Sequence, residues 1–343
     1  RLADSRHRGC ASMDAPFGKH LLLATACAVS GWLLWRRKQQ GCRWPGWGTN
    51  KYASWLIWSQ KSQKIAEDTK LRPSDVVVIT FPKTGTTWCQ QTCEQLRTGG
   101  DMAFSEITER QPWLDIAWDC GQDLSLDQVA SPRLFKSHQR LSAINLGAKY
   151  LSIIRKPEAV LMSWFNFQKG KGRPFYIDYA DSNDYAATEH FAGNNIFGTN
   201  LWDYYIELWD ARNDPNVLVL CYEALMEDQL AHLPVIAKFL DVPSDEARLQ
   251  TVVAMTTKEF MATHDDQFDD NFIARKSREL GRTPKAFATG VKVTSGPRDC
   301  LTLATKTWLQ VKWLQRVAPR TGLASYEEMA RAITALSRPG AKL

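Results

Sequence analysis

The chain has 343 residues, of which 44% are hydrophobic and 23% are charged, and its formal net charge is +6. This balance is that of a globular protein, so it excludes a disordered chain, a collagen-like repeat and a membrane protein with many spans. The small positive excess suits a polyanionic small ligand or a membrane surface better than nucleic acid, and we predict no nucleic-acid partner.

The N-terminal part contains an uncharged segment, residues 21–35, which a cluster of three basic residues follows at once. Its fifteen residues are fewer than the roughly 20 that a helix needs to cross a bilayer. No clear cleavage site follows it. A short membrane anchor, a cleaved targeting signal and an interfacial helix are all compatible with this pattern, and Met13 could be the true start. The basic cluster favours a cytoplasmic catalytic part, with or without a membrane anchor.

We divide the chain into an N-terminal extension, residues 1–71, and one domain, residues 72–340. Residues 39–71 show no regular period and are interpreted as a linker. Within the domain, four short apolar runs predict buried strands, at Asp75–Phe81, Arg133–Lys136, Tyr150–Arg155 and Asn216–Tyr222. The polar stretch 263–298 precedes the last part of the chain.

Helical patterns alternate with these strands, at Thr86–Arg97, Pro157–Gly170, Thr199–Asn213, Ala224–Leu240 and Ser244–Ala254, and two more lie near 299–317 and 324–337. Strands that alternate with helices indicate βαβ units. The sequence therefore predicts an α/β fold in which helices cover both faces of a parallel sheet.

Directly after the first predicted strand comes the sequence Phe81-Pro-Lys-Thr-Gly-Thr-Thr-Trp88. A tight glycine-containing loop between a strand and a helix directs backbone N–H groups and the helix N-terminus at an anion. Lys83 adds a positive charge, and the threonines can bind oxygen or cap the helix. The alternative is a plain strand-to-helix turn. ATP hydrolysis is disfavoured, because in ATP-binding loops of this kind the lysine follows the last glycine.

This loop resembles the 5′-phosphosulfate-binding loop of the cytosolic-type sulfotransferases, which use 3′-phosphoadenosine 5′-phosphosulfate (PAPS) as sulfonyl donor. Further blocks match that family in chain order: residues 131–138, ending in Lys-Ser-His; residues 154–165, from Arg155 to Ser163; and the strand ending in Tyr222-Glu223. Residues 256–261 keep the spacing of the segment that borders the adenine. The resemblance covers about residues 72–298 and implies the family's P-loop-like fold.

The resemblance implies a role for each matched residue. Sulfonyl transfer is an in-line displacement like phosphoryl transfer, so positioning and charge stabilisation dominate. His138 would be the general base, and Lys83 and Lys136 would stabilise the charge at the transferred group. The other five histidines and the eight cysteines show no metal-ligand spacing, and no metal is expected. The implied donor-binding residues are Lys83, Thr84, Gly85, Thr86, Thr87, Trp88, Arg155, Ser163, Tyr222, Thr256 and Lys292.

Two of these assignments keep an alternative. Trp88 would stack on the adenine, but an aromatic residue in the first turn of a helix is more often part of the core. Residues 290–297 replace the family's Arg-Lys-Gly and Gly-Asp-Trp pattern, and only Lys292 and Gly296 match it. Either Lys292 binds the 3′-phosphate with help from neighbouring basic residues (Arg275, Lys276 or Arg278), or this loop has diverged.

The sequence thus predicts an enzyme that transfers the sulfonyl group of PAPS to a hydroxyl or amine of a small acceptor and releases 3′-phosphoadenosine 5′-phosphate (PAP). The acceptor pocket would come from the segments 98–125 and 169–200. Their aromatic residues favour an apolar or aromatic acceptor; they include Phe104, Trp113, Trp118, Phe175 and Tyr176. The alternatives are a kinase-like phosphotransferase and a membrane-tethered binding protein with a degenerate nucleotide site. The sequence gives no oligomeric state.

Overall fold

The computed structural model describes residues 58–144, 147–168, 181–186, 191, 193, 199–282 and 301–337. The chain divides into two units, Arg1–Trp44 and Pro45–Leu343, and every described residue lies in the second. The predicted anchor segment 21–35, Lys292, Phe175 and Tyr176 lie outside the described residues. Within the described part, no helix has both the length and the apolar character that a bilayer crossing requires.

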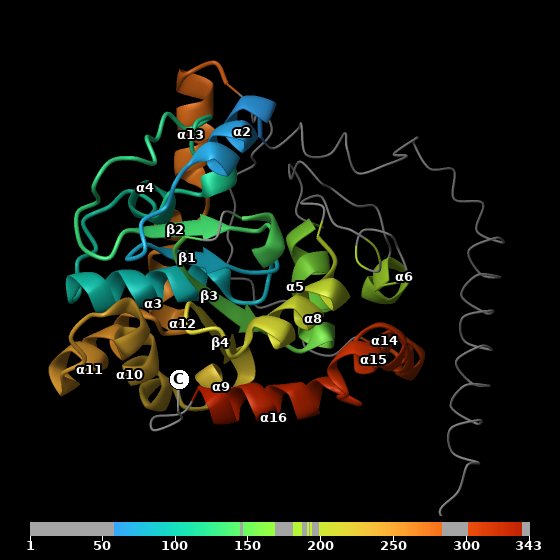
Figure 1. Cartoon of the computed structure of the whole chain (residues 1–343). Helices are drawn as coiled ribbons and strands as arrows, with labels where there is room; N and C mark the ends of the chain where they lie inside the picture. The colour runs from blue at the N-terminus through green and yellow to red at the C-terminus, as the bar shows by residue number, and fades with distance from the viewer. Residues whose placement is uncertain are drawn as a thin grey trace, which may run out of the picture. The chain divides into compact units, whose positions relative to one another are not determined.

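Four parallel strands form the sheet: β1 (Val76–Ile79), β2 (Leu134–Ser137), β3 (Lys149–Ile154) and β4 (Val217–Cys221), in the order β2-β1-β3-β4 (Figure 1). Val76 lies opposite Leu134 on one side and Lys149 on the other. The chain leaves β1 for β2 on one side and returns to β3 on the other. The strand order therefore switches between β1 and β3, the place where open α/β sheets bind ligands at the carboxyl ends of their strands.

Every residue of β1, β2 and β4 is buried, because helices cover both faces of the sheet. On one face, Val76, Val78 and Ile153 pack in a core with α3 (Thr86–Thr98), α10 (Gln229–Leu240) and α11 (Glu246–Met255). On the other face, Ser152 bonds to the Tyr204 hydroxyl of α8 (Leu201–Ala211), and α5 (Pro157–Gln168) lies beside α8 (Figure 1). The predicted parallel sheet with helices on both faces is confirmed.

The remaining elements connect these layers or extend them. α16 packs against β4, and α14 contacts α5 and α8. The bounds are α2 Gln60–Asp68, α4 Ile107–Arg110, η2 Leu114–Ile116, η3 Leu141–Ala143, α6 Ser182–Ala186, α9 Tyr222–Glu227, α12 Lys258–Thr263, η4 Asp265–Phe268, α13 Asn271–Glu279, α14 Leu303–Arg316, α15 Ala318–Thr321 and α16 Tyr326–Leu336.

Two predicted boundaries are wrong. The single helix expected over Ala224–Leu240 is two helices, α9 and α10, because the Asp228 side chain caps the second one by accepting a hydrogen bond from the Ala231 N–H at 3.1 Å. Part of the expected linker is α2, whose Ser59 cap follows Trp58. Trp58 packs edge-on against Trp113, with ring centroids 6.3 Å apart, and anchors this helix to the domain.

Candidate active site

The carboxyl ends of the four strands bring the sequence-predicted residues to one edge of the sheet. The glycine loop follows β1, His138 follows β2, Arg155 follows β3, and Tyr222 follows β4. Lys136 is the third residue of β2 itself. Residues that are far apart in the sequence therefore meet where the strand order switches.

The loop after β1 has a backbone that favours glycine. Lys83 and Gly85 have φ angles of 72° and 117°, in the left-handed region that non-glycine residues rarely adopt. A Cβ atom on Gly85 would also lie 2.8 Å from the Tyr222 ring. Gly85 is the N-cap of α3 and gives it no side-chain cap. The first-turn N–H groups of α3 therefore suit an anionic ligand.

The threonines of this loop divide into two kinds. The Thr84 hydroxyl and N–H both donate to the Phe81 carbonyl, at 2.8 and 3.2 Å, and the Thr86 hydroxyl bonds to that of Thr80 at 2.6 Å. These two side chains are buried and shape the loop. Thr87 is half-buried in the first turn of α3, where its hydroxyl can face a ligand.

Arg155 joins the glycine loop to the other side of the switch point. Its Nη1 donates to the Lys83 carbonyl at 2.8 Å, and its guanidinium lies 4.2 Å from the centre of the Tyr222 ring. The Tyr205 hydroxyl donates to the Arg155 carbonyl. Among the described residues, nothing accepts a hydrogen bond from the buried Nε of Arg155. A planar guanidinium with an unused donor fits a phosphate oxygen.

His138 is nearly buried, with 8% of its surface exposed, and its Nδ1 lies 2.9 Å from the Thr80 carbonyl oxygen. A carbonyl can only accept a hydrogen bond, so Nδ1 carries the proton in the neutral ring and Nε2 is the nitrogen that can accept one. Thr80 is the residue before Phe81, at the start of the glycine loop. The predicted base and the predicted donor loop therefore lie in direct contact.

The ammonium group of each predicted catalytic lysine, Lys83 and Lys136, contacts an aromatic ring. The Lys136 ammonium lies 4.2 Å from the centre of the Trp113 ring, and that of Lys83 lies 4.3 Å from the centre of the Phe167 ring. Trp113 also meets His138 edge-on, with ring centroids 5.2 Å apart. Cation–π contacts of this kind hold an ammonium group without neutralising its charge.

Other predicted residues lie in different surroundings. Trp88 is 8% exposed and belongs to the core beneath α3, as its alternative interpretation expects, so its stacking on adenine stays a prediction. The Thr256 hydroxyl donates to the Val252 carbonyl at 2.7 Å and ends α11. Ser163 is half-buried on α5. Phe104, expected in an acceptor pocket, instead packs in the core against Phe268.

Two residues beside the catalytic candidates, Phe167 and Asp115, were not predicted from the sequence. The Phe167 ring contacts the Lys83 ammonium, and nothing in the apolar segment around Phe167 indicates this role. Asp115 lies buried next to His138, and the one signal for it is that it is the only charged residue between Pro112 and Trp118. Burial raises the pKa of the Asp115 carboxyl, although hydrogen bonds from Gln139, Ser137 and Trp113 act in the opposite direction. In the described ranges, no cluster of His, Cys, Asp and Glu residues could hold a metal ion.

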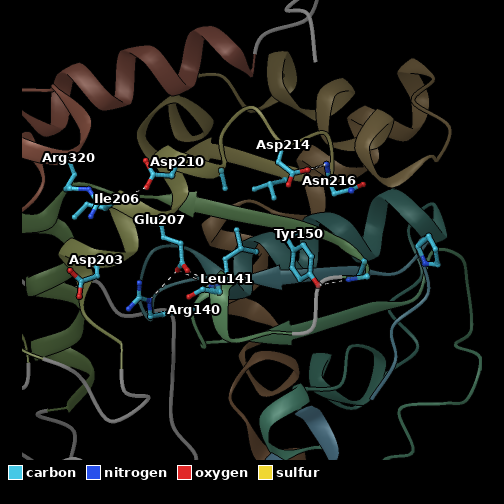
Figure 2. A pocket seen from close by; sticks show the side chains of 16 residues that line it. Arg140, Leu141, Tyr150, Asp203, Ile206, Glu207, Asp210, Asp214, Asn216 and Arg320 are labelled. Carbon is cyan, nitrogen blue, oxygen red and sulfur yellow. Dashed lines mark hydrogen bonds and ion pairs between the residues drawn. The ribbon is translucent and has the colours of Figure 1, made fainter. Parts of the chain in front are cut away.

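A hollow of about 850 Å³ lies at the opposite, amino edge of the sheet, between α8, η3 and the starts of β3 and β4 (Figure 2). Its four carboxylates all have partners, so it gathers no unpaired charge. The pairs are Asp203 with Arg316 at 3.0 Å, Glu207 with the Ser142 N–H at 2.7 Å, Asp210 with Arg320 at 3.8 Å and Asp214 with the Asn216 N–H at 2.9 Å.

Comparisons with known proteins agree with this geometry. A family model described as the sulfotransferase domain matches residues 73–281. Rabbit amine sulfotransferase is 28% identical over 225 residues, covering 63% of this chain and 71% of that protein. Human sulfotransferase 2A1 is 28% identical over 204 residues, covering 57% of this chain and 69% of that protein.

Solved structures share the fold. Mouse sulfotransferase SULT7A1 in complex with PAP superposes with a TM-score of 0.59 at 15% identity, covering 81% of this chain and 94% of that one. Retinol dehydratase in complex with androsterone and PAP gives a TM-score of 0.61 at 19% identity, covering 78% and 88%. Both similarities cover a larger share of the chain than the family model, which matches residues 73–281.

Proposed function

The chain belongs to the sulfotransferase family and is a PAPS-dependent sulfotransferase. We propose that it transfers the sulfonyl group of PAPS to a hydroxyl or amine of a small apolar acceptor. In this proposal His138 is the general base. One observation carries this proposal. The predicted base bonds to the Thr80 carbonyl, three residues before Lys83, and Arg155 bonds to the carbonyl of Lys83 itself.

The residues of the carboxyl edge fit the two anionic ends of PAPS. The backbone of the glycine loop, Lys83 and Thr87 would hold the 5′-phosphosulfate end at the N-terminus of α3. Arg155, whose buried Nε is available for an acceptor, would hold the 3′-phosphate together with Ser163. Trp88, Tyr222, Thr256 and Lys292 complete the predicted set. When bound, PAPS supplies an activated sulfonyl group for in-line transfer.

His138 would accept the proton of the attacking hydroxyl or amine at Nε2. The bond from Nδ1 to the Thr80 carbonyl fixes the tautomer, so that the ring does not have to rotate before it accepts a proton. Lys83 and Lys136 would stabilise negative charge on the leaving and transferred oxygens. Their ammonium groups lie 4.3 and 4.2 Å from the centres of aromatic rings, which hold them at this edge.

The acceptor is proposed to be a small molecule with a flat apolar body. The half-buried ring of Phe167, beside the Lys83 ammonium, favours such a body. Retinol dehydratase is solved with androsterone, an apolar alcohol, and the rabbit relative is named an amine sulfotransferase. A hydroxyl and an amine therefore both belong in the search. A cytoplasmic location for the catalytic part and anchoring through residues 21–35 stay predictions.

The test is transfer of labelled sulfonate from PAPS to a pooled library of apolar alcohols, phenols and amines. We expect a labelled product with the wild-type protein and a loss of about 100-fold to 10,000-fold in kcat for His138→Ala. The control is His232→Ala, because His232 lies on α10 and is not one of the predicted site residues. Calorimetry should show that His138→Ala still binds PAP. Full activity in this variant would contradict the role of His138, and no PAP binding by the wild type would favour the binding-protein alternative.

A further inference from the structure

Asp115 in η2 receives hydrogen bonds from both sides of the end of β2. Its side chain accepts from the Trp113 indole N–H at 2.7 Å and from the Ser137 hydroxyl at 2.9 Å. The Gln139 side-chain amide also donates to it, and the His138 backbone contributes to lowering the pKa of its carboxyl against the effect of burial. Asp115 is 1% exposed, so water does not replace these partners. Two of the three hydrogen-bond donors, Ser137 and Gln139, flank His138 in the chain.

Trp113 transmits this restraint to both catalytic candidates. Its ring meets the His138 ring edge-on at 5.2 Å, and the Lys136 ammonium lies 4.2 Å from the ring centre. The backbone is tied in the same place, because the Lys136 N–H donates to the Pro112 carbonyl at 3.0 Å. An indole whose N–H is bonded to a buried carboxylate cannot turn without breaking that bond. The orientation of one ring therefore limits where both His138 and Lys136 can go.

We propose that Asp115 is a positioning residue, which holds His138 and Lys136 in the geometry for sulfonyl transfer through Trp113 and through Ser137 and Gln139, the two residues that flank His138. The inference rests on the proposed function of His138 and adds a residue to it. Asp115 accepts only from protein groups in the described contacts, so its effect reaches the reaction through its neighbours. A displacement of about 1 Å in a catalytic group lowers a rate by about 100-fold.

The test variant is Asp115→Asn, which keeps the size of the side chain but replaces one acceptor oxygen by an N–H donor. Asparagine cannot accept from all of these donors at once, so either the Trp113 indole N–H loses its acceptor or the Gln139 amide must turn over, and in both cases the 137–139 segment is held differently. We expect kcat to fall by about 100-fold while the KM for PAPS and the affinity for PAP stay unchanged. We also expect the His138 Nδ1–H proton resonance, assigned by its absence in His138→Ala, to shift or disappear.

Asp119→Asn is the matched control. Asp119 is equally buried, lies four residues on, and accepts the Ser59 N–H at 2.7 Å, away from His138. It should keep the wild-type kcat and the His138 resonance. Equal losses in the two variants would show a general structural role and overturn the proposal, as would an Asp115→Asn protein with the wild-type kcat and an unchanged resonance.

Trp113→Phe decides the question if Asp115→Asn does not fold. It removes the indole N–H but keeps a ring beside His138, so kcat should fall while PAP binding is kept. An unchanged kcat would overturn the proposal. If the wild type itself transfers no sulfonate, the proposed function fails. The His138 Nδ1–H resonance then tests the positioning role alone. A shift of this resonance in Asp115→Asn supports the positioning role, and an unchanged resonance overturns it.

Discussion

The two edges of the same parallel sheet use charged residues in opposite ways. At the amino edge, Asp75 and Arg133 form a two-pronged buried pair at 2.5 and 2.8 Å, and the carboxylates of the nearby hollow all have partners. At the carboxyl edge, Lys83 and Gly85 have left-handed backbones and the Arg155 Nε has no described acceptor. The amino edge neutralises its charges within the protein, and the carboxyl edge keeps them for a ligand.

This difference shows that the size of a hollow is a poor guide to function in this protein. The 850 Å³ hollow at the amino edge has room for a ligand, but its carboxylates have partners within the protein, and Arg140, whose buried Nε has no hydrogen-bond partner among the described residues, forms an ion pair with Glu207 at 3.5 Å (Figure 2). A left-handed backbone and a buried arginine donor with no described counter-charge occur instead where the four strand ends meet. Substitutions at the amino edge should therefore change stability alone, and those at the carboxyl edge should change donor binding or catalysis.

The largest effect is expected at the amino edge, for Arg133→Met. The substitution leaves the Asp75 carboxylate buried without its counter-charge, and removing one partner of such a pair costs about 3–5 kcal/mol of folding free energy. Urea unfolding should show this loss. At a temperature where the variant is folded, kcat and the KM for PAPS should equal those of the wild type. A reduced kcat with normal stability would contradict the division of roles between the edges.

The next largest effect is expected for Gly85→Ala at the carboxyl edge. The new Cβ would meet the Tyr222 ring at 2.8 Å, and alanine is strained by about 1–3 kcal/mol at a φ of 117°. Relief of this strain must distort the loop, so PAP affinity should fall by about 10-fold to 100-fold.

Gly322→Ala is the control for this second variant. Gly322 also has a positive φ, 74°, but a Cβ there would meet nothing within 4 Å, and it ends α15 rather than the donor loop. We expect it to lower the stability somewhat and to leave PAP affinity unchanged in calorimetry. Equal PAP affinities for the two variants would show that the Gly85 loop does not bind the donor.

A smaller effect is expected for Arg155→Lys. Lysine keeps the positive charge but loses the planar group that lies over Tyr222 while it bonds to the Lys83 carbonyl. The loss of one charge-assisted hydrogen bond should weaken PAP binding by about tenfold. Arg140→Lys, at the edge of the hollow, is the matched control and should bind PAP as the wild type does. Unchanged binding in Arg155→Lys would remove Arg155 from the donor site.

The strand and loop pattern made the fold predictable, and with it the meeting of the candidate-site residues at the carboxyl edge of the sheet. Continuous apolar runs such as 76–79 are buried on both faces, and the glycine loop after them has a local conformation that its own residues impose. The break at Asp228 was missed because an apolar helical pattern continues across it. The helix α2 was missed because Trp58, which anchors it, lies in a segment with no regular period and finds its partner Trp113 far along the chain.

The proposed role of Asp115 could not be predicted from the sequence, for a related reason. Its partners come from residues 113 and 137–139, and only the pairing of β2 with the segment before η2 brings them together. The local sequence pattern predicts the glycine loop that a ligand would contact. It does not give the tertiary hydrogen bonds that hold the neighbouring side chains, because those depend on how separate segments of the chain pack.

The smallest effect is expected for Arg320→Ala in the hollow. Arg320 and Asp210 are 3.8 Å apart and both are more than half exposed, and exposed pairs contribute little to stability because water and salt screen them. Unfolding, PAP affinity and kcat should all match the wild type. The hollow lies between α8 and the amino ends of β3 and β4, and the carboxyl ends of the same strands lie at the proposed donor site. A change in kcat would therefore mean that the two edges are coupled through α8. It would thereby contradict the separation of roles on which the other three predictions depend.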